Sequence, residues 1–101
     1  ITYPSTRSGV YERVTYVNEK SYPNFTAALY ATFSYNVANK EVSCVSKYSR
    51  YDGLNSLDEE ILSDTGKGTS CTATLKFYYS DRFNNKTIKV TCNYKGDPKY
   101  S

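Results

Sequence analysis

The sequence predicts an α+β fold in which one N-terminal helix precedes an antiparallel sheet of two hairpins. Three observations support it: two C-terminal segments alternate strictly between apolar and polar residues, a segment near residue 30 does the same, and three valines near the N-terminus recur at helical spacing. We expect one domain over residues 1–101, because 101 residues fit a single domain. An all-β sandwich or barrel is the alternative.

The first element is a predicted helix over about residues 9–20. Val10, Val14 and Val17 lie at helical spacing after Ser8, whose side chain suits an N-cap. The same segment contains a run of strand-forming residues, so a strand is the competing interpretation.

The first hairpin is predicted to begin near Ala27. Apolar residues occupy every second position from Ala27 to Val37, as in a strand with one buried face. A turn over residues 38–40 leads into the second strand, Glu41–Val45, which is rich in β-branched residues.

A second, shorter helix is predicted between the hairpins. Ser56 and Glu59 have the spacing of a capping box, which favours a helix over Leu57–Leu62. An exposed acidic loop is the alternative for this segment.

The second hairpin follows from the clearest pattern in the chain. Cys71–Tyr79 and Lys86–Lys95 both alternate with a period of two, and a turn-rich connection over residues 80–85 joins them.

Composition excludes several kinds of chemistry. The chain has no histidine, which excludes catalytic pairs or triads and zinc sites that use one. The three cysteines form no C-x-x-C pair, so we expect no metal and no cofactor. No segment approaches the ~18 apolar residues of a membrane span. The net charge of +3 is compatible with an anionic partner.

The chain is expected to be secreted as a mature form from which a signal peptide has been removed. It contains no methionine, and Asn24 and Asn85 begin N-glycosylation motifs. Cys44 and Cys71 are the predicted disulfide, which would stabilise the fold by roughly 3 kcal/mol. Cys44 with Cys92 is the competing pair.

Several tyrosines are candidates for recognition. Tyr30 and Tyr78 lie on the polar faces of their predicted strands, and Tyr48 and Tyr51 flank Arg50. Exposed tyrosine beside a cation suits contact with proteins, glycans or stacked bases.

The order of these elements resembles the small secreted guanyl-specific ribonucleases of fungi and the ribonuclease-like effectors of plant-pathogenic fungi. The resemblance rests on the motif Tyr22-Pro23-Asn24 after the predicted helix and on a last hairpin that ends in Val90-Thr91-Cys92. It covers about residues 8–95, with an insertion near residues 54–67.

The resemblance implies a set of former ribonuclease positions. Tyr22 matches the family's tyrosine, Glu41 stands near its general base, and Lys76 stands near its arginine. Asn24 and Cys92 replace its two histidines, so the proton donor that cleavage needs is missing. The resemblance therefore implies an inactive scaffold that is reused for binding.

Two functions follow from these predictions. The first is a secreted, non-catalytic effector whose partner is a host protein or RNA. The alternative is an all-β extracellular module, similar to the β-barrels of fungal major allergens, that binds protein or glycan.

Overall fold

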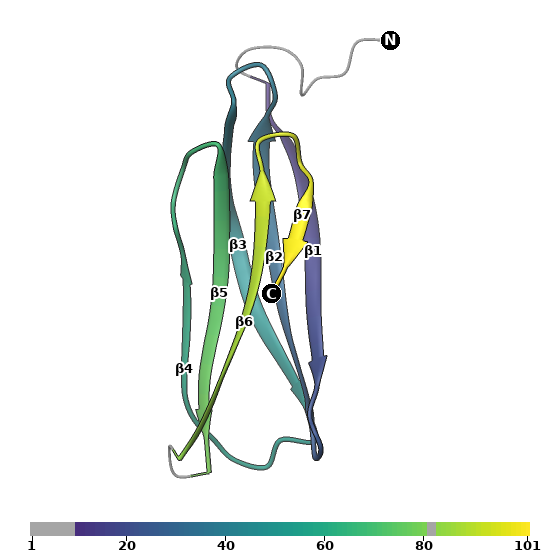
Figure 1. Ribbon diagram of the computed structural model, residues 1–101, viewed down its shortest axis with the longest axis vertical. Helices are drawn as coiled ribbons and strands as arrows, with labels where there is room; N and C mark the ends of the chain where they lie inside the picture. The colour runs from purple at the N-terminus through teal and green to yellow at the C-terminus, as the bar shows by residue number, and fades with distance from the viewer. Residues whose placement is uncertain (1–9, 81–82) are drawn as a thin grey trace.

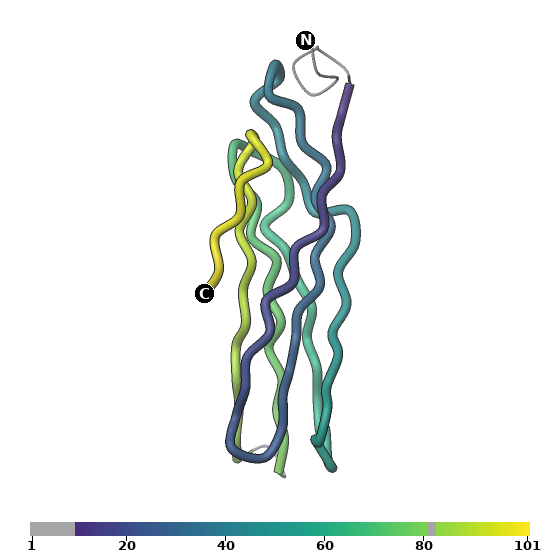
Figure 2. Tube along the Cα trace, turned by 90° about the vertical axis from the view of Figure 1, so that its right-hand side faces the viewer, coloured from purple at the N-terminus to yellow at the C-terminus, as the bar shows by residue number. Residues whose placement is uncertain are grey.

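The chain folds into β-structure. The computed structural model describes residues 10–80 and 83–101, and in these residues seven antiparallel strands form two sheets (Figure 1). The strands are β1 (Glu12–Ser21), β2 (Thr26–Asn36), β3 (Glu41–Asp52), β4 (Leu57–Asp64), β5 (Ser70–Tyr79), β6 (Asn84–Asn93) and β7 (Pro98–Tyr100). One sheet has the order β1-β2-β3 and the other the order β4-β5-β6-β7. In the upper part of Figure 2 they appear as two layers, with β7 on the left and β1 on the right.

The predicted α+β fold is wrong, and the N-terminal helix is its first error. Residues 12–20 of the helix predicted over residues 9–20 belong to β1, which pairs with β2 along its whole length. Val14 packs against the core, whereas Val17 lies on the other side of the sheet. Val14 and Val17 therefore lie on opposite faces of a strand, and not on one face of a helix. The predicted N-cap at Ser8 lies outside the described residues.

The predicted helix over Leu57–Leu62 is also wrong, because β4 occupies this segment. The capping-box spacing does not decide the conformation here, since β4 supplies hydrogen-bond partners to the edge of β5. Leu62, for example, pairs with Leu75 and packs against the core. No helix in the described part of the chain is long and apolar enough to span a membrane.

Both predicted hairpins are present, with different strand limits. β3 continues beyond the predicted end at Val45 to Asp52, and a bulge at Val45 interrupts its pairing with β2. β5 and β6 pair from Ser70 with Asn93 to Tyr79 with Asn84.

The core lies between the inner faces of the two sheets. Most of its deeply buried side chains occupy alternate positions of three strands, as the period-two pattern predicts: Ala27, Leu29, Ala31 and Phe33 of β2, Cys71, Ala73, Leu75 and Phe77 of β5, and Ile88, Val90 and Cys92 of β6. Val42 of β3 joins them.

Polar contacts close the open sides of the sandwich. On the β1 side, the amide of Asn18 donates to the backbone oxygens of Lys89 at 2.9 Å and Ser101 at 3.0 Å. On the β3 side, Lys47 Nζ lies 2.9 Å from Asp64 Oδ2. These contacts hold the sheets together where β1, β3 and β4 leave edges unpaired.

Candidate functional site

The positions suggested by the ribonuclease resemblance are spread over the molecule. Tyr22 and Asn24 lie at the turn between β1 and β2, whereas Glu41 begins β3 at the opposite end. The eleven residues of β2 separate these ends by ~35 Å at ~3.3 Å per residue. Lys76 is exposed on the outer face of β5, and Cys92 is fully buried. The five side chains therefore do not share one site.

The three cysteines lie on β3, β5 and β6. Cys71 and Cys92 are opposite each other on β5 and β6 and are fully buried, whereas Cys44 on β3 is partly exposed. All three are free thiols in this structure, and the disulfide of Cys44 with Cys71, or with Cys92, stays a prediction. Burial raises the pKa of Cys92 to about 11, so this group is a thiol at neutral pH and a poor nucleophile.

The two predicted glycosylation sites lie at the same end of the sandwich. Asn24 is exposed in the turn before β2, and Asn85 is exposed near the start of β6. Their occupancy stays a prediction. Asn24 also lines a pocket, so a glycan attached there would stand at its mouth.

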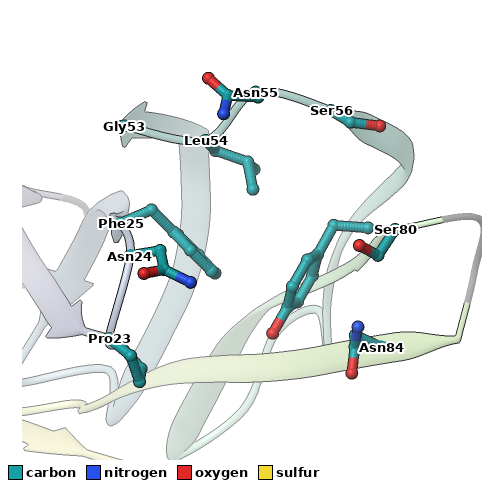
Figure 3. Close-up of a pocket in the computed structure, with 10 residues that line it drawn as sticks. Pro23, Asn24, Phe25, Gly53, Leu54, Asn55, Ser56, Ser80 and Asn84 are labelled. Carbon is teal, nitrogen blue, oxygen red and sulfur yellow. The ribbon is translucent and has the colours of Figure 1, made fainter.

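This end of the sandwich contains a pocket of about 370 Å³ (Figure 3). The connections β1–β2, β3–β4 and β5–β6 build it, and its lining residues are Pro23, Asn24, Phe25, Gly53, Leu54, Asn55, Ser56, Tyr79, Ser80 and Asn84. Figure 3 shows Asn24, Phe25 and Leu54 on one side and Ser80 and Asn84 on the other. The volume lies at the lower end of the range of roughly 300–1,000 Å³ for ligand sites.

An aromatic cluster supports the pocket. The rings of Phe25 and Tyr79 line it with centroids 5.0 Å apart and planes at 71°. Phe77 is fully buried and contacts both rings, with centroid distances of 6.1 Å to Phe25 and 6.0 Å to Tyr79. Tyr51 and Tyr22 pack against Phe77 from other sides. The apolar part of the pocket is therefore preformed by side chains that hold one another in place.

A glycine shapes the wall between two of the connections. Gly53 has a φ of +83°, and a Cβ there would lie 3.0 Å from the backbone oxygen of Asn24. The facing turn is closed by a hydrogen bond of 2.8 Å from the Tyr22 N–H to the Phe25 oxygen. Close approach of these two backbone segments thus requires glycine.

The polar groups of the pocket are uncharged. Three amide side chains and two serine hydroxyls line it: Asn24, Asn55, Asn84, Ser56 and Ser80. Within the described part of the chain these groups make no side-chain hydrogen bond and the lining has no charged residue. An amide can both donate and accept, so these groups are available to a ligand with hydroxyls.

Two tyrosines beside the pocket are protonated, and therefore uncharged, at neutral pH. Burial raises the pKa of Tyr51 to about 12, and its hydroxyl has no hydrogen-bond partner among the residues that the structure describes. Burial also raises the pKa of Tyr22. No group of histidine, cysteine, aspartate or glutamate that could hold a metal ion occurs within residues 10–80 and 83–101.

Sequence reasoning identified Asn24 and missed the other polar groups of the pocket. The available signal was the recurrence of asparagine and serine in three connections: Asn24, Asn55-Ser56 and Ser80 with Asn84. In an antiparallel meander every second connection emerges at the same end, so these three meet. Finding them required the correct number of strands, which the two predicted helices concealed.

Comparison with known proteins supplies no family. The chain matches no protein-family model and no curated protein sequence. Among solved structures it is similar to the hypothetical protein lmo2686 from Listeria monocytogenes EGD-e, with a TM-score of 0.47 and 17% sequence identity. That match covers 88% of this chain and 71% of the other. A likeness at this TM-score supports no conclusion about function.

Proposed function

We propose that the protein is a secreted, non-catalytic binding module that takes a neutral sugar unit into the pocket at the end of the sandwich. The observation that carries this proposal is an aromatic base beneath a rim of uncharged amides and hydroxyls, whose side chains bond to none of the residues that the structure describes. Aromatic rings pack against the C–H face of a sugar ring, while amides exchange hydrogen bonds with its hydroxyls.

The uncharged lining favours a neutral glycan over the other partners expected from the sequence. Binding of RNA depends strongly on cations that neutralise phosphate, and the described lining contains none. A hollow of about 370 Å³ has the size of a small-molecule site, whereas a protein interface is normally a broad surface that buries about 800 Å² per partner. Host protein and RNA stay predictions to which the pocket adds no support.

Binding is favoured over hydrolysis of the sugar. Most glycosidases place two carboxyl groups beside the glycosidic bond. The described lining has no carboxylate, and the chain has no histidine that could replace one. Secretion is supported by the two glycosylation motifs in the sequence.

Titration of backbone amide NMR signals tests the proposal. The protein should be made without glycosylation, so that Asn24 is unmodified, and titrated with a panel of neutral oligosaccharides, a sulfated oligosaccharide and a short RNA. We expect a neutral sugar to shift signals of the three pocket connections, Asn24, residues 53–56 and Ser80 first. Shifts confined to other surfaces, or no response to any neutral sugar, would contradict the proposal.

Two neighbouring asparagines provide a matched control. Asn84 lines the pocket, whereas Asn85 belongs to the outer face of β6 opposite Tyr78. Asn84→Ala should weaken sugar binding about 5- to 10-fold, which corresponds to the free energy lost with roughly one hydrogen bond. Asn85→Ala should leave binding unchanged. Equal affinity of both variants would exclude the pocket as the binding site.

A further inference from the structure

The outer face of the three-stranded sheet carries an exposed apolar row. Val17, Tyr30 and Tyr48 are paired across β1, β2 and β3, so they form one line across the sheet. Val17 is 41% exposed and Tyr48 is 49% exposed, and the rings of Tyr30 and Tyr48 stack 4.7 Å apart at 6°. Such a row of large side chains on an exposed sheet face is a candidate interaction surface, and the charges beside it show what partner fits it.

The neighbouring row carries opposite charges at its two edges. Glu19 on β1 and Arg50 on β3 both pair with Ala28 of β2, and both are exposed. Ala28 is small, so the space between the two charged side chains is a hollow of about 290 Å³. The row has room for side chains from a partner and offers it one negative and one positive group.

This arrangement of charges is complementary to itself. A two-fold axis parallel to the strands places β1 of one copy over β3 of a second copy. Each row of paired residues then faces the same row of the second copy, because the rotation does not change positions along the strands. Glu19 then faces Arg50 of the second copy, twice by symmetry. In the same geometry Val17 lies on Tyr48 of the second copy, and the two Tyr30 rings meet at the axis.

The other simple two-fold arrangement gains no charge pair. In this arrangement the axis runs along the apolar row, perpendicular to the strands, and exchanges the rows on its two sides. Glu19 would then face Thr15, and Arg50 would face Ser46, of the second copy. Complementarity of charge therefore selects the axis along the strands.

We infer that the protein forms a two-fold symmetric homodimer through the outer face of β1, β2 and β3, with its axis parallel to the strands. The remaining charges of this face are compatible with the dimer: Arg13 meets Ser43 and Asp52 meets Ser21 of the second copy. Glu41 at the start of β3 accepts a hydrogen bond from Tyr11 at the β1 edge of its own chain, so the axis places the second copy's Tyr11, and no like charge, opposite it. Two twisted sheets pack face to face with their strands about 30° apart, which a two-fold axis along the strands permits.

The interface is small, so the association is reversible. Three strands ~4.8 Å apart with about nine residues each cover on the order of 400 Å² of sheet per copy. A standard interface buries about 800 Å² per partner, which indicates a dimer that dissociates in dilute solution.

Sedimentation equilibrium with charge-reversed variants tests the dimer. The unmodified chain should show a monomer–dimer equilibrium as its concentration rises toward the millimolar range. Glu19→Arg and Arg50→Glu should each weaken self-association at least 10-fold, because each places like charges opposite each other twice. A 1:1 mixture of the two variants should associate again, since only contact between copies pairs their charges correctly.

Two controls separate this result from misfolding and from general charge effects. Circular dichroism of each variant should match the unmodified chain, and recovery in the mixture requires that both variants are folded. Lys89→Glu reverses a charge on an exposed position of the other sheet and should leave association unchanged. A monomer at every concentration, a dimer unaffected by both reversals, or no association in the mixture would overturn the inference.

The dimer has one consequence that rests on the proposed function. An axis along the strands leaves both sandwiches pointing the same way, so the two pockets open at the same end. Such a pair binds a repeating glycan with higher apparent affinity than one pocket can. Sedimentation measures self-association in the absence of sugar. The dimer is therefore tested independently, even if the sugar-binding proposal fails.

Discussion

The two ends of the sandwich use the same amide side chain in opposite ways. At the pocket end, the amides of Asn24, Asn55 and Asn84 stand over an aromatic base and bond to no described residue. At the other end, Asn36 is fully buried, donates to the backbone oxygen of Val10 and accepts from the Asn39 N–H at 2.7 Å.

This difference separates structure from recognition. A buried amide that bonds to the backbone holds a turn in place, and losing it leaves unpaired groups inside the protein. An exposed amide without a partner contributes little to stability and is free to bind. Changes at the pocket rim should therefore affect binding, whereas changes in the aromatic base or at the opposite end should affect stability.

The largest expected effect is a loss of stability when the aromatic base of the pocket end is removed. Phe77→Ala should lower the free energy of unfolding by about 3–5 kcal/mol, because the fully buried ring contacts four other aromatic rings. Urea unfolding followed by circular dichroism measures it. Tyr48→Ala, which removes a half-exposed ring, should cost less than about 1 kcal/mol. Similar losses in both variants would contradict the assignment of Phe77 to the core.

The next effect concerns close packing at the opposite end. Gly96 and Gly66 have φ values of +87° and +85°, but a Cβ at Gly96 would lie 2.6 Å from the ring of Tyr35, whereas a Cβ at Gly66 meets nothing within 4 Å. Both alanine variants should lose ~1–2 kcal/mol from the backbone. Gly96→Ala should lose a further 1–3 kcal/mol, roughly, from overpacking. Thermal unfolding of the two variants compares them, and equal losses would show that Tyr35 moves away freely.

A third pair of variants compares the two kinds of amide directly. Asn36→Ala should lower the free energy of unfolding by ~1–3 kcal/mol, because it leaves the Val10 oxygen and the Asn39 N–H without their partner. Asn84→Ala should change it by less than ~0.5 kcal/mol. Chemical unfolding of both proteins tests the comparison, which fails if the rim variant is the less stable.

The smallest expected effect depends on pH. A hydrogen bond from Lys47 lowers the pKa of Asp64 below its ordinary value of 3.8. This carboxylate therefore stabilises the fold above pH 3.8, and its contribution is lost as the pH falls through the lowered pKa. The contribution is at most ~1 kcal/mol, since the pair is partly exposed. Asp64→Asn should reduce the drop in stability between about pH 6 and pH 3, and an unchanged drop would contradict this role.

The sequence predicted the central strands well and the edge strands poorly. In β2, β5 and β6 the inward residues over 27–33, 71–77 and 88–92 are all apolar, so the period of two is visible in the sequence. In β4 the inward positions include Glu60 and Asp64, which bond to Ser49 and Lys47 of β3. The partners that make charged inward residues acceptable lie on another strand, so a local pattern cannot reveal them.

β1 was mistaken for a helix for a related reason. Its inward positions include Asn18, whose partners belong to β6 and the C-terminal residue Ser101. Its outward Val17 belongs to the exposed row and adds a misleading apolar position. Of the pocket, only Asn24 was identified from the sequence, because the site is made by connections that meet only after the whole chain has folded.

The strand order has a consequence for how the chain can be divided. Every pairing inside a sheet joins strands that are neighbours in sequence, and residues 53–56 carry the chain from one sheet to the other. Residues 12–52 and 57–100 are thus two contiguous meanders, each with its own complete set of strand pairs. Cleavage within residues 53–56 would leave two fragments joined by the apolar contacts between their inner faces, by the polar contacts at the open sides and by the backbone hydrogen bonds between Val42 and Gly68. We expect such fragments to act as a split protein, in which two separate polypeptides report their own proximity by reassembling the sandwich.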